Sequence, residues 1–254
     1  MRICRIAHPG GIDYAVLEEE GFALLLDPFE AQPRTTGVRV PAARARLLAP
    51  IEPRTVVGMA HNTGPADRAL PPAAFLKAAR SVIGPGAQVR LPDDGGHVVA
   101  EGELAMVIGR DTAGVRPVDL LSCVLGFTAA NDVTDRAAQS RDPLWTEAKS
   151  RHTFTPIGPW IETDLDPADV AITLAVNGSE AKTASTRDLA RDPGEVLAYL
   201  SRLMPLGPGD LVLTGAPAPA VPISAGDDVS IRVEGLGELV NPVEAFPLPD
   251  GLAA

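Results

Sequence analysis

Short apolar segments separated by proline and glycine run along most of the chain and predict a protein built mainly of β-strands. Beyond residue 50, the segments with this pattern are TVVGM (55–59), VVAEGELAMVIG (98–109), VLGFTAAND (124–132), VAITLAVNG (170–178), DLVLTG (210–215), DVSIRVEG (228–235) and LVNPVEAF (239–246). Segments with helical spacing are few. We therefore expect a mixed α/β fold that is mainly β.

One segment, residues 191–204, carries clear helix signals. Asp192 suits the N-cap, Pro193 the first helical position and Glu195 the capping-box position. The apolar residues that then fall on one helical face are Val196, Leu197, Leu200, Leu203 and Met204. This helix is expected to pack on a sheet. Residues 71–83 stay open between a helix and a short strand, because helix formers are flanked by prolines there.

The first 50 residues predict a small β unit. RICRIA (2–7) and YAVLEE (14–19) alternate apolar and polar residues, and FALLLD (22–27) is a short apolar run. A stretch rich in arginine, alanine and proline follows and suits a crossing to a larger unit. We therefore expect a small N-terminal β domain over 1–50 and a larger domain over 51–254.

Composition and charge narrow the classes of function. With 254 residues, 45% hydrophobic and 22% charged, the chain is typical of a globular protein. Its formal net charge of -11 disfavours nucleic acid and anionic membranes as partners. The sequence shows neither a transmembrane run nor a signal peptide, which predicts a cytoplasmic protein. Cys4 and Cys123 are far apart and are expected to be buried thiols.

Two carboxylates interrupt the apolar segment VVAEGELAMVIG. On an extended strand Glu101 and Glu103 point to the same face, while residues such as Leu104 and Met106 form an apolar opposite face. Like charges so close repel each other unless a cation or water lies between them. The pair alone indicates either a strand with one wet face, which is the commoner case, or part of a cation site.

Asp132 changes that balance, because it stands at the end of the apolar segment 124–132. A third carboxylate at a strand end can complete an oxygen site with Glu101 and Glu103. Mg²⁺ and Mn²⁺ are hard cations that suit such ligands and keep positions open for substrate oxygens. Zinc is disfavoured, since no histidine or cysteine belongs to the set.

Five blocks, together with these residues, resemble the fumarylacetoacetate hydrolase family in order and spacing. They are AEGELAMVIG, GFTAANDVTDRAAQ, WTEAKSRHTFTPIGPWI, LGPGDLVLTGAP and VSIRVEGLGELVNPV. The resemblance covers nearly the whole chain, including the N-terminal unit. It implies a mixed β-sandwich roll, a homodimer, and Mg²⁺, Mn²⁺ or Ca²⁺ at the active site.

By position, the resemblance also implies roles for single residues. The family's metal carboxylates match Glu101, Glu103 and Asp132, and its active-site lysine matches Lys149. Arg136 and Gln139 match polar groups that hold the substrate. The implied substrate is a small anionic oxo acid or diketo acid, whose carboxylate Arg136 can grip in bidentate fashion.

The reaction that this resemblance implies is hydrolysis of a carbon–carbon bond in a 1,3-diketo acid of the acylpyruvate type, through a metal-bound enolate. Hydrolysis also requires a base that activates water. The family takes it from a histidine–glutamate pair, but this chain has Gly64 and Asp67 at those positions. His61 and His152 are the candidate replacements, and for each an ordinary structural histidine is an equally good interpretation.

Two other hypotheses follow from the missing base. One is a 2-oxo-acid decarboxylase, tautomerase or specialised lyase or cyclase that uses the same enolate without an activated water. The other is a metal-binding protein without catalytic activity. A further departure supports both: Ala216 stands where the family commonly has a second threonine, so a hydroxyl for the substrate is missing.

Overall fold

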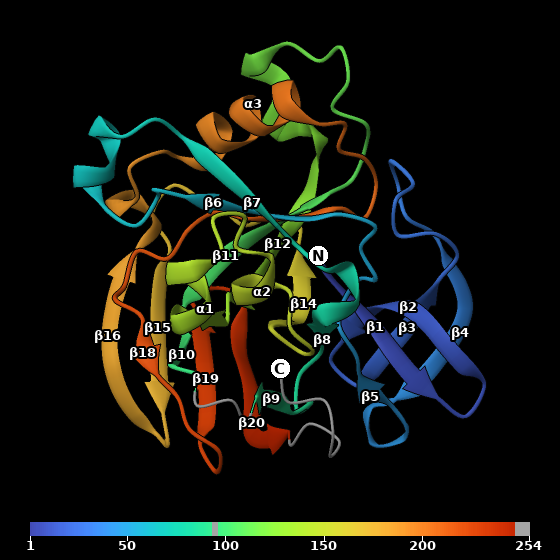
Figure 1. Cartoon of the computed structure of the whole chain (residues 1–254). Helices are drawn as coiled ribbons and strands as arrows, with labels where there is room; N and C mark the ends of the chain where they lie inside the picture. Colours follow the sequence, from blue (N-terminus) through green and yellow to red (C-terminus); the bar gives the residue numbers. More distant parts are fainter. Residues whose placement is uncertain (93–95, 247–254) are drawn as a thin grey trace.

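The computed structural model describes residues 1–92 and 96–246, and three β-sheets form its framework (Figure 1). The largest has twelve strands, with β5 (Arg46–Leu47) paired to β1 and β8 (Val82–Ile83) paired to β14 beside its main path. In spatial order that path is β4 (Thr35–Pro41), β3 (Gly21–Leu25), β2 (Gly11–Glu18), β1 (Arg2–His8), β14 (Thr155–Glu162), β12 (Val124–Asn131), β11 (Gly102–Ile108), β17 (Leu211–Leu213), β6 (Val56–Ala60) and β7 (Ala73–Lys77). The mainly β fold expected from the sequence is confirmed.

The other two sheets are smaller. One has three short strands in the order β13 (Thr134–Asp135), β10 (Val98–Ala100) and β18 (Val221–Pro222). The other has five, in the order β16 (Ser179–Ser185), β15 (Ala171–Val176), β19 (Asp228–Val233), β20 (Gly237–Phe246) and β9 (Val89–Pro92). Side chains of the five-stranded sheet and of the large sheet share one buried cluster, so the core lies between these two layers.

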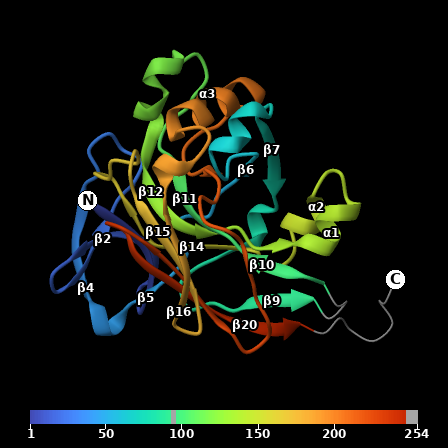
Figure 2. The ribbon, with the colours of Figure 1, turned by 90° about the vertical axis from the view of Figure 1, so that its left-hand side faces the viewer.

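Helices are short and few in the described part of the chain. They are α1 (Arg136–Arg141), α2 (Thr146–Lys149), α3 (Pro193–Leu203) and the 3₁₀ turns η1 (Ala42–Arg44), η2 (Pro65–Ala69), η3 (Ala79–Ser81), η4 (Pro117–Cys123) and η5 (Thr186–Asp188). Figure 2 shows α1 and α2 side by side, next to β7 and β10. None of the helices in the described ranges is long and apolar enough to cross a membrane.

Helix α3 begins as its sequence predicts. Asp192 and Glu195 form a capping box with Pro193 in the first turn. Three of its apolar side chains, Val196, Leu197 and Leu200, are buried in the main core. The expectation for Leu203 was wrong, because this side chain is 54% exposed at the end of the helix.

The N-terminal strands extend the large sheet. Strand β1 pairs with β14 through Arg2–Glu162 and Ile3–Ile161. The same strands enclose an apolar cluster of their own, made by Cys4, Ile6, Ala15, Phe22, Leu24 and Val40. Both cysteines are buried free thiols, as expected. The division at residue 50 stays a prediction, and the last eight residues of the second predicted domain lie outside the described residues.

The segment with Glu101 and Glu103 differs from a strand with one wet face. It consists of two strands in different sheets, β10 and β11, and Glu101 lies between them. Residues 98–108 are buried on both faces. Beyond Glu103, the face that was expected to be wet continues as Ala105 and Val107 and packs on a second buried cluster. The wet-face interpretation was therefore wrong, because layers cover both sides of β11.

Residues 71–83, which the sequence left open, are extended. Strand β7 pairs antiparallel with β6, and the 3₁₀ turn η3 and strand β8 follow directly. In β7 the buried side chains are Phe75 and Lys77, while Leu76 between them is 56% exposed. The strand thus buries a lysine and exposes a leucine, the reverse of the usual preference.

Candidate active site

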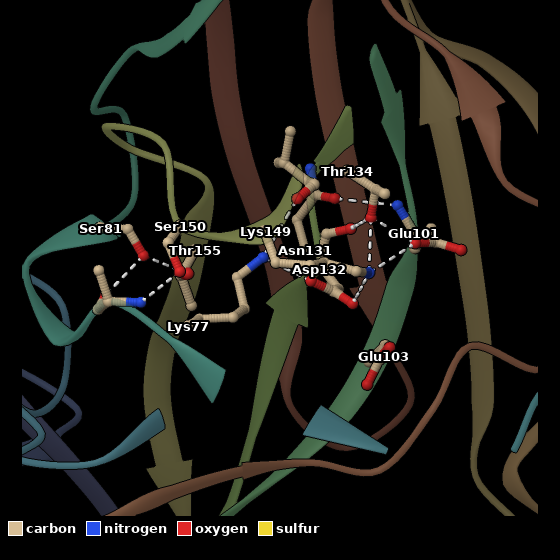
Figure 3. Close-up of polar contacts among 12 residues, drawn as sticks. Lys77, Ser81, Glu101, Glu103, Asn131, Asp132, Thr134, Lys149, Ser150 and Thr155 are labelled. Atoms are coloured by element: carbon tan, nitrogen blue, oxygen red, sulfur yellow. Dashed lines mark hydrogen bonds and ion pairs between the residues drawn. The ribbon is translucent and has the colours of Figure 1, made fainter. Parts of the chain in front are cut away.

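Five buried charged side chains meet where β11 begins and β12 and β7 end. We call them the floor of the site: Lys77, Glu101, Glu103, Asp132 and Lys149 (Figure 3). Backbone geometry places the acids. The amide of Asp132 donates to the carbonyl of Glu101 (2.9 Å), and the amide of Glu101 donates to the side chain of Asn131 (3.0 Å). These bonds fix the end of β12 against the break between β10 and β11.

Glu103 is held by the loop that follows β17. Its Oε2 accepts a hydrogen bond from the amide of Gly215 (2.7 Å). Gly215 has φ +110°, and a Cβ there would lie 2.1 Å from the carbonyl oxygen of Asn62. Only glycine suits this position, for both reasons. The loop therefore approaches Glu103 closely enough for its backbone to bind the carboxylate.

Lys149 ends the short helix α2 and contacts two of the acids. Its Nζ donates to Glu101 Oε2 (3.2 Å), to Thr134 Oγ1 (2.6 Å) and, over a shorter distance, to Asp132 Oδ2. It also lies 4.5 Å from the centre of the Phe75 ring, within cation–π range. The lysine that the sequence placed in the site is therefore at its centre.

Lys77 is a second floor lysine, and the sequence argument missed it. Its Nζ donates to Asp132 Oδ1 (2.5 Å) and to the carbonyl of Val133 (3.1 Å), and the side chain is fully buried. The segment AAFLK gave one usable signal, since a strand that buries Phe75 also buries Lys77 two residues later. With the structure of 71–83 left open, that signal could not be read.

Burial and charge shift the pKa values of the floor in opposite directions. Burial raises the pKa of Glu103 well above its usual value, and the charge of Asp132 adds to this. Burial also acts to raise the pKa of Asp132, but the charges of Lys149 and Lys77 outweigh it and keep this pKa low. Asp132 is thus a firmly ionised acid, while Glu103 has no cation of its own.

The two lysines differ as well. Burial lowers the pKa of Lys77 to about 8, although Asp132 works against this. For Lys149 burial acts in the same direction, but the charges of Asp132 and Glu101 prevail and raise its pKa. Lys149 is therefore a permanent cation, and Lys77 can exchange a proton near neutral pH.

The floor lies at the bottom of a cavity of about 220 Å³, which we call the carboxylate pocket. Seven of the eight residues that the sequence proposed for the site line it: Glu101, Glu103, Asp132, Arg136, Gln139, Lys149 and His61. Lys77 is not among the lining residues and contacts this group through its hydrogen bond to Asp132. The eighth, His152, is not among the lining residues, and its ring lies 6.1 Å from that of Phe246.

Arg136 and Gln139 form one wall of the pocket and come from α1. Arg136 Nη2 donates to Glu101 Oε1 (2.9 Å), and Nη1 donates to Gln139 Oε1 (2.6 Å). The Arg136 side chain is 37% exposed, so its guanidinium spans from the floor to solvent. Phe75, Trp145, Met59 and Ala216 add apolar surface to the wall.

We call His61, Thr63 and Asp67 the rim of the pocket; they lie between β6 and β7. His61 is exposed, with φ +56°, and its Nδ1 is 3.2 Å from the carbonyl oxygen of Pro71. Because a carbonyl only accepts, the neutral imidazole donates from Nδ1 and leaves the Nε2 lone pair free. Asp67 Oδ2 accepts from the amide and the hydroxyl of Thr63, both at 2.8 Å.

Buried polar groups hold the rim from below. Asn62 is fully buried and bonds the backbone of Arg191 in both directions, as acceptor (2.7 Å) and as donor (3.1 Å). The Arg191 guanidinium donates in turn to the carbonyls of His61 (2.9 Å) and Leu70 (2.5 Å). The rim backbone is therefore fixed, although its side chains are exposed.

The floor carboxylates fit a divalent cation in their chemistry, since all three are oxygen donors facing one pocket. In the arrangement seen in residues 1–92 and 96–246, however, no group of three or more His, Cys, Asp or Glu could hold a metal ion. Both oxygens of Asp132 are bonded to lysines. Those of Glu101 are bonded to Arg136, Thr134 and Lys149. A metal ion would therefore compete with protein cations for the carboxylate oxygens.

Comparison with known proteins agrees with this site. Residues 52–244 match the family model described as "Fumarylacetoacetate (FAA) hydrolase C-terminal", and residues 1–50 match "Rv2993c-like, N-terminal". The chain belongs to the fumarylacetoacetate hydrolase family. Protein Rv2993c of Mycobacterium tuberculosis is 42% identical to it over 264 residues, with 96% of this chain and 98% of that protein covered.

Solved structures of the fumarylacetoacetate hydrolase family carry different activities in their names. A 5-carboxymethyl-2-hydroxymuconate delta-isomerase from Mycobacterium smegmatis has a TM-score of 0.92 at 40% identity, covering 97% of this chain and all of that one. A maleylpyruvate hydrolase from Sphingobium sp. SYK-6, in complex with manganese (II) and pyruvate, has a TM-score of 0.80 at 28% identity, covering 96% and 99%. One fold thus serves isomerases and hydrolases.

Within this family the chain departs at the rim. Gly64, at the position expected for the family's histidine, has a φ of -171° and nothing within 4 Å of a built Cβ. Asp67, at the glutamate position, is bonded to Thr63, and its pKa is lowered by those hydrogen bonds and, to a smaller extent, by His61. The floor keeps every residue that the resemblance implies, so the departures lie at the rim and, through Ala216, in the wall of the pocket.

Proposed function

We propose that this protein is an enzyme that acts on a small 2-oxo acid, with hydrolysis of a carbon–carbon bond in an acylpyruvate-type acid as its first candidate reaction. The observation that carries the proposal is the convergence of three carboxylates, Lys149 and Arg136 on one pocket of about 220 Å³, with Lys77 bonded to Asp132 behind it. A pocket of this size suits a short-chain acid. Such charge density in a buried site is typical of catalysis.

Glu101, Glu103 and Asp132 would hold Mg²⁺ or Mn²⁺, with Ca²⁺ as a third possibility. Such an ion, when bound, supplies a Lewis acid that polarises the 2-oxo group. Glu103 supports this part of the proposal, because its raised pKa marks a buried carboxylate that lacks a cation.

The charge of the pocket indicates the charge of the substrate. Glu101, Glu103, Asp132 and the rim acid Asp67 carry four negative charges when ionised, and Lys77, Lys149 and Arg136 carry three positive charges. A divalent ion brings the sum to one positive charge, which an anionic substrate neutralises. We therefore propose a small anionic oxo acid or diketo acid as the substrate.

Arg136 and Gln139 are proposed to orient the substrate carboxylate. The Arg136 guanidinium reaches from Glu101 to the solvent side of the pocket, where an entering carboxylate meets its planar fork. Lys149, a permanent cation beside Asp132, stabilises negative charge that develops next to the carbonyl carbon.

His61 is proposed as the base that activates water for hydrolysis. Its Nδ1 faces the Pro71 carbonyl, so Nε2 is free to accept a proton. The water then attacks the second carbonyl of the diketo acid, and the bond between that carbon and the methylene carbon next to the 2-oxo group breaks. Its electron pair stays on the methylene carbon, and a proton taken up there gives the 2-oxo acid beside the released carboxylic acid. His152 is left out of the proposal because it is not among the residues that line the pocket.

A tautomerase, isomerase or decarboxylase is the second candidate. Lys77 favours it, since a buried lysine with a pKa of about 8 can move a proton without any activated water. The exposed position of His61 and the glycine at position 64 favour it too. This reaction needs only the floor.

The experiment is to incubate the protein with Mn²⁺ in D₂O and follow short acylpyruvates and oxaloacetate by NMR. Acid products from acylpyruvates support the hydrolase. Deuterium exchange next to the 2-oxo group, or CO₂ release, without acid products supports the second candidate. If every substrate stays unchanged while oxalate still binds, the protein is catalytically silent and both enzyme proposals fail.

We also propose that the protein is a homodimer and that it is cytoplasmic. Light scattering tests the oligomeric state, and cell fractionation tests the location.

A further inference from the structure

A second cavity lies away from the carboxylate pocket. It has a volume of about 810 Å³ and lies between residues of the N-terminal strands and the segment around β8. Three stretches line most of it: residues 46–49, 51–54 and 79–87, with Arg5 of β1 added. The cavity is large enough for a metabolite and much larger than the carboxylate pocket.

Four arginines line this cavity, which we call the arginine pocket: Arg5, Arg46, Arg54 and Arg80. The only acid among its lining residues is Glu52, which is bonded to Arg5 at 2.5 Å. The side chains of Arg46, Arg54 and Arg80 have no hydrogen bond, ion pair or ring contact within residues 1–92 and 96–246. One face of the protein therefore gathers three unpaired positive charges.

This arrangement is unusual for this chain. Acids outnumber lysine and arginine by 33 to 22, and most arginines elsewhere are bonded to carboxylates or carbonyls. With acids so abundant, unpaired arginines that share one cavity are cations left available for a ligand. Apolar side chains between them, Ile51, Val82 and Ile83, give a ligand body a surface to pack on.

We propose that the arginine pocket binds a small multivalent anion with two or more phosphate or carboxylate groups. Guanidinium groups bind both kinds of anion in bidentate fashion, and several around one cavity match several anionic groups on one molecule. The net charge of -11 repels anions elsewhere, which makes this cavity a selective site.

The site also lies close to the floor along the chain. Arg80 belongs to η3, which begins two residues after Lys77. The same segment is tied to the loop after Lys149: the Ala78 amide donates to Ser150 Oγ (3.0 Å), and Ser81 Oγ bonds Thr155 Oγ1 (2.7 Å) (Figure 3). An anion on Arg80 therefore contacts the turn that follows β7, the strand that ends at the second floor lysine, Lys77.

The test is isothermal titration of metal-free, full-length protein with inorganic pyrophosphate and, separately, with citrate. We expect saturable binding of one anion per chain. The two titrations distinguish a phosphate ligand from a carboxylate ligand. The triple variant R46A/R54A/R80A is expected to bind about a hundredfold more weakly, since each lost guanidinium contact removes a charge-assisted pair. These side chains are exposed and unpaired, so thermal unfolding of the variant should match the parent.

The matched control is R44A/R202A/K182A, which removes the same charge from exposed side chains outside both pockets. It should bind both anions within about twofold of the parent, because none of the three residues lines the arginine pocket and their exposed charges are screened by salt. The proposal is overturned if the parent binds neither anion, or if the control loses as much affinity as the pocket variant. It also fails if the parent is a dimer that binds neither anion and R46A/R54A/R80A is a monomer, since the arginines then serve a contact between chains.

Discussion

The floor and the rim of the carboxylate pocket differ in their burial and in their hydrogen-bond partners. The floor is a set of buried charges, each acid within hydrogen-bonding distance of a lysine, a hydroxyl or a backbone amide. The rim is exposed, and its polar side chains bond mostly to their own segment. A buried charge network tolerates few substitutions, whereas an exposed segment tolerates many.

This contrast assigns the two regions different parts of the chemistry. In the proposed function, the floor holds the metal ion and stabilises negative charge next to the substrate's carbonyl, a step that hydrolases, tautomerases and decarboxylases share. The rim contains the only histidine among the lining residues of the pocket, His61, which is the proposed base for activating water. Family members with one fold and different reactions are expected on this basis.

The largest expected effect is on the floor. Lys149→Met removes the cation that contacts both Glu101 and Asp132, and should lower every activity of the enzyme about a thousandfold. It should also lower the free energy of unfolding by about 3 kcal/mol, because buried carboxylates lose a partner. Steady-state kinetics and urea unfolding measure the two effects. Lys182→Met, on exposed β16, is the control and should change neither. Equal activity of the Lys149→Met and Lys182→Met variants would show that the floor does not take part in the mechanism.

The next prediction distinguishes the reaction step of the rim from that of the floor. His61→Ala should lower carbon–carbon cleavage about a hundredfold, since a general base is lost. Exchange of the α-proton should stay at the parent rate, because the floor is intact. NMR in D₂O measures both rates in one sample. His152→Ala is the matched histidine control and should behave as the parent. An equal loss of cleavage and of exchange in His61→Ala would mean that the rim also takes part in exchange of the α-proton.

A smaller gain is expected from restoring an imidazole. Gly64 has extended backbone, and a Cβ there meets no atom within 4 Å, so Gly64→His should fold normally. The new side chain stands three residues before Asp67 and should raise cleavage about tenfold relative to α-proton exchange. The ratio of the two rates is the measurement. An unchanged ratio would show that position 64 no longer faces the reacting atoms.

How far the sequence predicts this molecule differs between the same regions. Glu101, Glu103, Asp132 and Lys149 could be assigned because each lies in a block with a fixed order and spacing. Lys77 could not, since the alternation of β7 becomes visible only when β6 pairs with it. Burial on both faces of β11 could not be predicted from the sequence either, because it depends on layers formed by residues far away in the chain. Local patterns reveal strands, but tertiary packing decides which faces are wet.

The smallest expected effect concerns Lys77 and the pH dependence of stability. Its pKa is about 8 in the folded protein and 10.5 ordinarily, so between these values the unfolded chain binds more protons. The free energy of unfolding should therefore rise with pH in this range, by up to about 1 kcal/mol per pH unit from this group. Lys77→Met should lack that contribution. Urea unfolding of both chelator-treated proteins from pH 8 to 10 measures the difference, and equal slopes would place the pKa of Lys77 at its ordinary value.

The most direct test of the central claim, that the floor is a divalent-metal site for a 2-oxo acid, is a crystal of the protein soaked with Mn²⁺ and oxalate. We expect one anomalous manganese peak per chain, bound by Glu101, Glu103 and Asp132, with oxalate between the ion and Arg136. Manganese found elsewhere, or oxalate on Arg136 with no ion on the three carboxylates, would contradict the claim.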